Sequence, residues 1–298
     1  MTAFCLNLCE LVSHDHDSQW LTRLVARAAE ANGGQCLRLY AGSYFCARYF
    51  VAFPFWRPVA CVCRELSVPL SLVVPVASQS LLAKEKEVLG VALTELGGIV
   101  DEVTVNDPGM LSYLSGGLSG GERGVRNVRV NAGRLFFKDL RDVRIPGERD
   151  RMAQVAGLDR IHGGRYAGKL EDGSGGFAVQ SAEIDQLSNF LALPRPEDLS
   201  CEIALHVPFV YMSTGMVCKY GSIHRELKLK FRPNGECGLE CQHVIERTHG
   251  DFCGADVDLF RVGRTIFALP QRSCATSRPV ERSIYFPLRE AIQMSGEH

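Results

Sequence analysis

Helical and strand-like segments alternate over the first 107 residues, and this order leaves few architectures open. Between residues 18 and 32, apolar side chains recur at spacings of three and four, which predicts an amphipathic helix with Ser18 as its N-cap. The same pattern predicts further helices at 57–66 and 80–99, and strands at 35–42, 69–76 and 101–107. Such alternation favours an α/β fold with a parallel sheet, open or closed into a (β/α) barrel, and both forms place their sites at strand C-termini.

The later strand patterns lie beyond a central region with few periodic apolar positions. Glycines in the run from Gly116 to Gly124 predict a flexible loop, and residues 147–176, rich in Gly and Arg, predict an insertion or lid. No linker is clear enough to divide the chain. We therefore expect one domain over residues 1–298, a (β/α) barrel-like parallel sheet with a cysteine-bearing C-terminal part. The later strands are predicted at 176–185, 201–214, 264–270 and 282–288.

The charge balance argues against binding through a bulk electrostatic field. The chain has 33 basic and 34 acidic side chains, a net charge of −1 and 46% hydrophobic residues, so it can bury a large core. No apolar run reaches the roughly 18 residues that span a bilayer, and the N-terminal sequence lacks the pattern of a secretory signal. We therefore expect a cytoplasmic protein with no membrane span.

Cysteine is unusually frequent, with 12 residues among 298. In a reducing cytoplasm, surplus thiols indicate metal binding rather than disulfides. The most specific pattern is Cys218, eighteen residues and Cys237, then three residues and Cys241. Thiolates at such a spacing hold iron-sulfur clusters or zinc. The alternative is that these cysteines are small core residues, which the polar sequence GECGLECQH argues against.

A set of three cysteines needs a fourth ligand, and the residue pattern leaves several candidates. Cys46 lies just past the predicted strand at 35–42, at the end where (β/α) proteins assemble their sites. Cys61 and Cys63 have apolar neighbours that favour packing in a helix. Nearby histidines would suit zinc better than a cluster. The remaining candidates are Cys5, Cys9, Cys36, Cys201, Cys253 and Cys274, with His224, His243 and His249.

Five sequence features, in their order along the chain, resemble peptidase family U-thirty-two, the collagenase-like peptidases. They are LYAGSYFCARY from residue 39, VTVNDPGML from residue 103, VNAGRLFFKDLRDVRI from residue 130, FAVQSAEIDQL from residue 177, and the set of Cys218, Cys237 and Cys241. The resemblance covers most of the chain. It is nearest to the UbiV-like branch of the family, which acts in anaerobic ubiquinone biosynthesis.

This resemblance implies a [4Fe-4S] cluster bound by Cys46, Cys218, Cys237 and Cys241, with Tyr40-Ala41-Gly42 at the end of the strand before Cys46. It also implies oxygen-independent hydroxylation of the ubiquinone-biosynthesis type. The chain would be a catalytic or accessory subunit, with a paired subunit of the same family as its partner. Within the family, a peptidase or an RNA-modifying protein is the alternative, so the substrate is a small molecule or RNA. Outside it, the alternative is a non-catalytic protein braced by a structural zinc site of four thiolates.

Two acidic residues on a predicted strand suggest a further polar site. Glu183 and Asp185 lie two positions apart, so they share one face of the strand. A buried carboxylate would need a partner, for which Arg134 or Lys138 is a candidate.

Several common catalytic motifs are absent from the sequence. It has no Gly-x-Ser-x-Gly elbow, no Gly-Lys-Ser/Thr phosphate loop and no His-Glu-x-x-His helix. Asn106 and Asp107 either point into a site or cap the next helix.

Binding to RNA would need basic residues gathered on one face. The candidates for such a face are Arg126, Arg129, Arg134, Lys138, Arg141 and Arg144.

Overall fold

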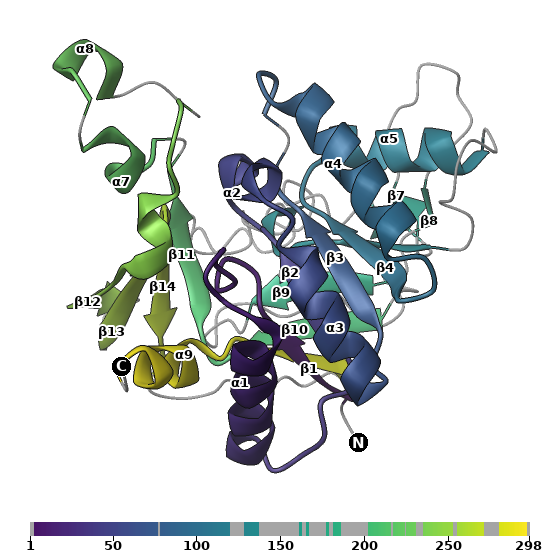
Figure 1. Ribbon diagram of the computed structural model, residues 1–298, viewed down its shortest axis with the longest axis horizontal. Coiled ribbons are helices and arrows are strands. Elements are labelled where there is room, and N and C mark those ends of the chain that lie inside the picture. Colours follow the sequence, from purple (N-terminus) through teal and green to yellow (C-terminus); the bar gives the residue numbers. More distant parts are fainter. Residues whose placement is uncertain are drawn as a thin grey trace.

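The centre of the molecule is a closed barrel of eight parallel strands, in the order β1-β15-β10-β9-β5-β4-β3-β2 (Figure 1). This confirms the predicted α/β fold with a (β/α) barrel-like parallel sheet. The barrel strands are β1 (Ala3–Asn7), β2 (Leu39–Gly42), β3 (Leu70–Val74), β4 (Val100–Val105), β5 (Arg129–Ala132), β9 (Ser181–Asp185), β10 (Glu202–Val207) and β15 (Arg282–Tyr285). The computed structural model describes residues 3–76, 78–119, 128–136, 161–162, 165–166, 177–178, 181–185, 202–215, 217–223, 225–230, 235–252, 255–270 and 280–296.

The last strand of the barrel lies between the first strand and β10. Arg282, at the start of β15, is level with Ala3 of β1 and with Ala204 of β10. β1 in turn pairs with β2, where Leu6 is level with Leu39. The two ends of the chain therefore meet in the wall of the barrel.

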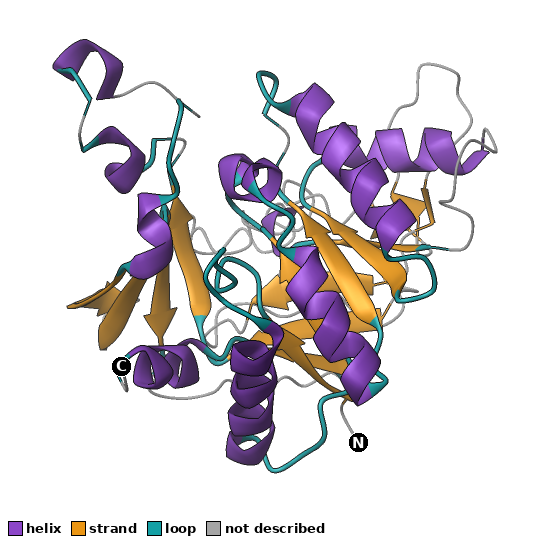
Figure 2. Ribbon diagram, in the orientation of Figure 1, coloured by secondary structure: helices purple, strands orange, loops and turns teal. Residues whose placement is uncertain are grey.

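Helices follow the strands and cover the outside of the barrel (Figure 2). The N-cap of the first helix is Asp17 rather than the predicted Ser18, because the Asp17 carboxylate accepts the Trp20 N–H at 2.7 Å. The helix buries Leu21, Leu24 and Ala28. This helix packs against α3 and α9. The helices around the barrel are α1 (Ser18–Ala31), α2 (Ala47–Ala52), α3 (Trp56–Leu66), α4 (Leu82–Glu95), α5 (Pro108–Ser119) and α9 (Leu288–Ser295).

A second, antiparallel sheet stands beside the barrel and carries the C-terminal cysteines (Figure 1). Its strands, in spatial order, are β11 (Val210–Thr214), β14 (Thr265–Leu269), β13 (Ala255–Val262) and β12 (Ile245–Phe252). Between β11 and β12 the chain forms α7 (Lys219–Ser222), α8 (Leu227–Lys230) and a 3-10 helix (Glu240–His243). A small third sheet consists of β6 (Ile161–His162), β7 (Arg165–Tyr166) and β8 (Phe177–Ala178).

Aromatic side chains join the second sheet to the barrel. The Phe45 ring stacks on Tyr211 of β11, with centroids 4.8 Å apart, and meets Phe267 of β14 at 5.7 Å. Phe209 and Phe286 pack edge to face at 5.9 Å. All five side chains are buried, so this contact is part of the hydrophobic core.

The structure departs from the sequence-based expectations at the predicted strand 201–214 and at the loop predicted from Gly116 to Gly124. The predicted strand at 201–214 is two strands, β10 and β11, because Pro208 has no N–H to continue a ladder. The loop predicted from Gly116 to Gly124 is wrong at its start, since α5 continues to Ser119. Glycine weakens a helix by only about 1 kcal/mol relative to alanine, so flanking residues can carry the helix through. The insertion or lid predicted at 147–176 lies outside the described residues except for β6 and β7.

Candidate functional site

The four cysteines singled out by sequence line one pocket between the barrel and the second sheet. Cys46 is the N-cap of α2, just after β2, and Cys218 is the N-cap of α7. Cys237 lies in the loop before the 3-10 helix, and Cys241 lies within that helix. Segments almost two hundred residues apart in sequence thus contribute thiols to the same pocket, at the C-terminal end of the barrel strands.

The loop that carries Cys46 leaves β2 through a glycine. Gly42 has a φ of 128°, and a Cβ there would lie 2.1 Å from the Val73 carbonyl oxygen, so only glycine fits. Ser43 then folds the loop back, because its hydroxyl accepts the Cys46 N–H at 2.7 Å. The Glu10 carboxylate, which follows β1, accepts the Ser43 hydroxyl and the Phe45 N–H. The Cys46 thiol is therefore held on a short, hydrogen-bonded loop.

Glycines also let the C-terminal cysteines approach one another. A Cβ on Gly221 would lie 3.3 Å from Cys237 Sγ and 3.8 Å from the Cβ of Cys218, so these two side chains pack across a bare backbone. A Cβ on Gly263, in the turn between β13 and β14, would lie 3.7 Å from Cys241 Sγ. The small residues thus shape the wall of the pocket around the sulfurs.

Backbone N–H groups point at three of the four thiols. Cys46 Sγ accepts the Tyr49 N–H at 3.5 Å, and Cys237 Sγ accepts the Leu239 N–H at 3.3 Å. Cys218 accepts backbone hydrogen bonds from the first turn of α7. Such hydrogen bonds favour the thiolate form and are one of the means by which proteins tune iron-sulfur centres.

The thiols differ in how readily they lose a proton. The Cys241 thiol donates to Cys218, and this lowers the pKa of Cys218 to about 6 while it raises that of Cys241. Burial raises the pKa of Cys237 to about 11 and also raises the pKa of Cys46. A cation among these sulfurs would offset the cost of ionising them.

Positive side chains outnumber carboxylates around the pocket. Its lining includes four cationic residues, Arg48, Arg225, Lys230 and Arg264, and two acidic residues, Glu10 and Glu236. The Glu10 carboxyl is buried, which raises its pKa to about 7. The cationic side chains favour negative charge on the cysteine sulfurs, whereas burial opposes it.

The four thiols that line this pocket are donors of the kind that hold iron-sulfur clusters or zinc. No three His, Cys, Asp or Glu side chains within the described ranges converge closely enough to hold one metal ion. In a cubane each thiolate binds a different iron atom, so its ligands are spread more widely than those of tetrahedral zinc. Four thiols around one pocket, several with N–H donors, form a donor set suited to a [4Fe-4S] cluster.

The other described cysteines are not among the residues that line this pocket. Cys63 is buried on α3, as predicted for a packing residue, whereas Cys61 on the same helix is exposed, so the packing prediction is wrong for Cys61. His249 is exposed on β12, with Nδ1 3.1 Å from Asp258. The remaining described cysteines, Cys5, Cys9 and Cys36, are buried in the core. Cys201, Cys253, Cys274 and His224 lie outside the described residues.

A second polar centre lies inside the barrel, around the predicted acidic pair. Glu183 Oε1 accepts the Thr104 hydroxyl at 2.6 Å, and its Oε2 accepts the Tyr44 hydroxyl at 2.8 Å and lies 3.2 Å from His206 Nε2. Burial raises the pKa of Glu183 to about 7 and lowers that of His206. This centre holds a carboxyl group and an imidazole in the core without a full charge pair.

Arg134 pairs with the other acid of the predicted set. The buried guanidinium makes an ion pair with Asp185, whose carboxylate also accepts the Tyr211 N–H at 3.1 Å. The prediction of Arg134 or Lys138 as partner for the buried Glu183 is therefore wrong for Arg134, and Lys138 lies outside the described residues. Burial of Arg134 also takes it away from any basic surface face.

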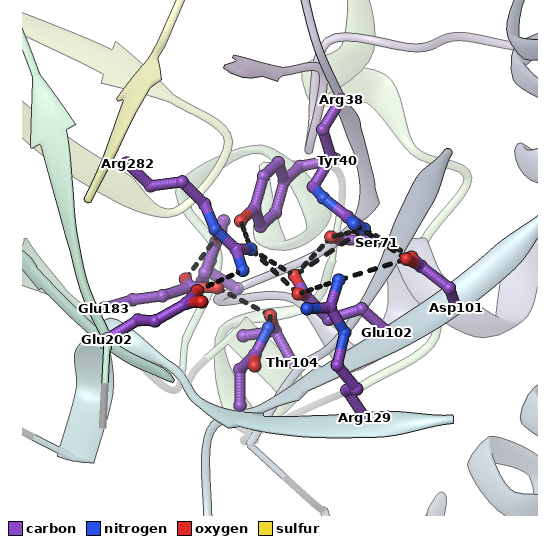
Figure 3. Close-up of polar contacts among 12 residues, drawn as sticks. Arg38, Tyr40, Ser71, Asp101, Glu102, Thr104, Arg129, Glu183, Glu202 and Arg282 are labelled. Carbon is purple, nitrogen blue, oxygen red and sulfur yellow. Dashed lines mark hydrogen bonds and ion pairs between the residues drawn. The ribbon is translucent and has the colours of Figure 1, made fainter. Parts of the chain in front are cut away.

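A third polar group closes the N-terminal end of the barrel with alternating charges (Figure 3). Arg282 donates to both oxygens of Glu102, at 2.9 and 2.8 Å, and to Glu202 at 2.7 Å. Although burial raises the pKa of Glu102, the positive charges of Arg38 and Arg282 bring it below its usual value. Barrel interiors are commonly filled by branched apolar side chains, so this polar filling is unusual. The other members are Arg38, Tyr40, Ser71, Asp101 and Arg129.

Sequence reasoning missed Glu10, Tyr44 and Arg264 as members of these centres. Nothing in their local sequence marks them, because each acquires its role from a partner far along the chain. Of the two polar residues at the end of β4, Asp107 caps the next helix as predicted, whereas the buried Asn106 bonds to the backbone instead. Asp107 accepts the Met110 N–H at 3.0 Å at the start of α5, and Asn106 Nδ2 donates to the Val74 carbonyl at 2.9 Å.

The comparisons with known proteins give no match: no family model, no curated protein and no solved structure is similar to this chain. Across the described ranges, none of the helices combines the length and apolar character needed to cross a bilayer. What the site does must therefore be argued from its own geometry.

We expect the buried Glu183 carboxyl to make stability depend on pH. Its pKa is raised from 4.5 to about 7 on folding, so the folded protein binds more protons than the unfolded chain between these values. The free energy of unfolding should fall as pH rises from about 4.5 to 7, by up to on the order of 3 kcal/mol from this group. In urea titrations, Glu183→Gln should reduce the dependence of the unfolding free energy on pH. Glu87→Gln, at an exposed position of α4, should leave that dependence unchanged. An equal slope in both variants would contradict this assignment.

Proposed function

We propose that this chain binds one [4Fe-4S] cluster through Cys46, Cys218, Cys237 and Cys241. The observation that carries the proposal is one pocket lined by all four thiols, although one follows a barrel strand and three lie in the segment between β11 and β12 of the second sheet. The proposed process is oxygen-independent hydroxylation of the ubiquinone-biosynthesis type. The chain acts in it as a catalytic or accessory subunit, in the cytoplasm, with a paired subunit of the same family as its partner.

The residues around the cysteines support such a role. When bound, a [4Fe-4S] cluster supplies electron transfer at a potential set by burial and by hydrogen bonds to its sulfurs. Phe45, Tyr49 and Val262 shield the pocket with apolar surface, which limits access of water to the sulfurs. Glu10 places a carboxyl group beside the cysteines, held by the loop that carries Cys46. The chain thus offers shielding, positive charge and a proton-binding group around one centre.

The alternatives within the family have less support from the described residues. RNA binding would need a basic face, yet Arg134 is buried and Arg129 lies 3.1 Å from Asp101. The other residues predicted for that face, Arg126, Lys138, Arg141 and Arg144, lie outside the described residues. A peptidase would need a nucleophile or an activated water, and the described part of the pocket brings together no such set apart from the cysteines themselves. A structural zinc site remains the rival that an experiment must separate.

Anaerobic purification followed by iron, sulfide and zinc analysis tests the proposal. We expect a brown protein with broad absorption near ~400 nm and about four irons and four sulfides per chain, as a cubane requires. A colourless protein that holds zinc tightly would support the structural zinc site instead, since zinc has no visible absorption. A protein with neither metal would refute both.

A further inference from the structure

A buried arginine connects the second sheet to the loop that carries Cys46. Arg264 lies in the turn between β13 and β14, directly after Gly263, whose φ of 57° lets the chain reverse there. Its Nη2 donates to the carbonyl oxygen of Phe45, the residue before Cys46. The side chain is buried and lines the cysteine pocket.

Both backbone polar groups of Phe45 are hydrogen-bonded, one from each side of the pocket. Its N–H is bound by Glu10, which belongs to the barrel, and its carbonyl is bound by Arg264, which belongs to the second sheet. The same turn places Gly263 next to Cys241. Arg264 therefore links the N-terminal cysteine loop to the hairpin that packs on a C-terminal cysteine.

The charge of Arg264 lies close to where a cluster would be bound. Burying a guanidinium costs several kcal/mol unless nearby negative charge offsets it. Four cysteine sulfurs line the same pocket, and a cluster with four thiolate ligands is negatively charged. Each added electron makes the centre more negative, so a fixed positive charge stabilises the reduced state more than the oxidised state.

We propose that Arg264 is a positioning residue that holds the Cys46 loop and raises the reduction potential of the cluster, an inference that rests on the proposed function. The hydrogen bond to Phe45 performs the first role, and the buried positive charge performs the second. The two roles can be separated, because Arg264→Lys keeps the charge while it loses the planar guanidinium, and Arg264→Gln loses both.

Two measurements test the two roles. The first is an anaerobic redox titration of the loaded protein, with dithionite as reductant and the EPR signal of the reduced cluster as readout. We expect a lower midpoint potential in Arg264→Gln, and a potential near that of the unchanged protein in Arg264→Lys. The second is the rate of Cys46 alkylation by iodoacetamide in metal-free protein, mapped by mass spectrometry. We expect faster alkylation in both variants, since neither holds the Phe45 carbonyl as the guanidinium does.

Arg247→Gln is the matched control, because Arg247 lies on the same sheet and its exposed side chain pairs with Asp258 outside the pocket. A loaded Arg264→Gln protein with the same potential as this control would overturn the electrostatic role. Unchanged alkylation of Cys46 in both Arg264 variants would overturn the positioning role. If the unchanged protein loads no iron, the proposed function and the role in potential both fail, while the alkylation result still decides whether Arg264 holds the loop.

Discussion

Cys46→Ser protein, purified without oxygen, should contain only a small fraction of the iron found in the unchanged protein. A cubane normally uses four protein ligands, and a serine hydroxyl is a poor substitute for a thiolate. The same loss is expected for Cys218→Ala, Cys237→Ala and Cys241→Ala. Iron and sulfide per chain, together with the absorption near ~400 nm, measure the effect.

Cys61→Ser and Cys63→Ser serve as controls, because both residues lie on α3 and neither lines the pocket. They should keep full iron. The outcome that contradicts the assignment most directly is a Cys46→Ser protein that still binds four irons, since Cys46 would then be a bystander. Iron loss in Cys61→Ser would mean that the N-terminal ligand is misplaced.

The position of Cys46 could be predicted because it depends on one local rule. Parallel strands in a barrel all end at the same edge, so a cysteine shortly after a strand must lie at that edge. The strand ending at Gly42 was visible in the sequence as an apolar run with a glycine stop, and β2 does end there.

The partners of the buried charges could not be predicted, because they depend on register and depth within the barrel. Glu183 and Asp185 share one strand face, yet Asp185 meets Arg134 whereas Glu183 meets Tyr44 and His206. The two carboxylates lie only two positions apart on β9, yet the ion pair with Arg134 is made by Asp185. Likewise Arg264 acquires its role from Phe45, 219 residues away, and no local pattern encodes that contact.

The β12 and β13 hairpin was missed for a different reason. Its strands carry many charged residues, such as Arg247 and Asp258, which form ion pairs on an exposed face of the sheet. Because one face of these strands is exposed to solvent, only about every second residue is apolar, and the polar residues between them suggest a loop. The sequence therefore predicted the barrel better than the second sheet, whose connection between β11 and β12 contains three of the four cysteines.

Arg282→Met should destabilise the protein by up to about 3–5 kcal/mol, the cost of removing one partner from a buried ion pair. Arg282 is the member of the polar group at the N-terminal end of the barrel that reaches across from the last strand, β15, to Glu102 on β4. Without it, the buried Glu102 keeps the Ser71 hydroxyl as its hydrogen-bond donor, and the guanidiniums of Arg129 and Arg38 lie 3.6 and 3.9 Å away. Denaturant titration of the variant measures the loss, with Arg289→Met on the exposed face of α9 as the control.

A second substitution separates loss of the charge pair from a change in packing. Glu102→Leu removes the carboxylate that Arg282→Met leaves without its two guanidinium hydrogen bonds, so the double variant should be more stable than the sum of the two single losses predicts. We expect a coupling energy of about 0.5–3 kcal/mol, the range measured for residues within one ion-pair network. Additive losses would show that Arg282 and Glu102 stabilise the barrel independently. A loss in Arg282→Met no larger than in Arg289→Met would show that closure of the barrel by β15 depends on backbone pairing and apolar contacts rather than on this buried charge.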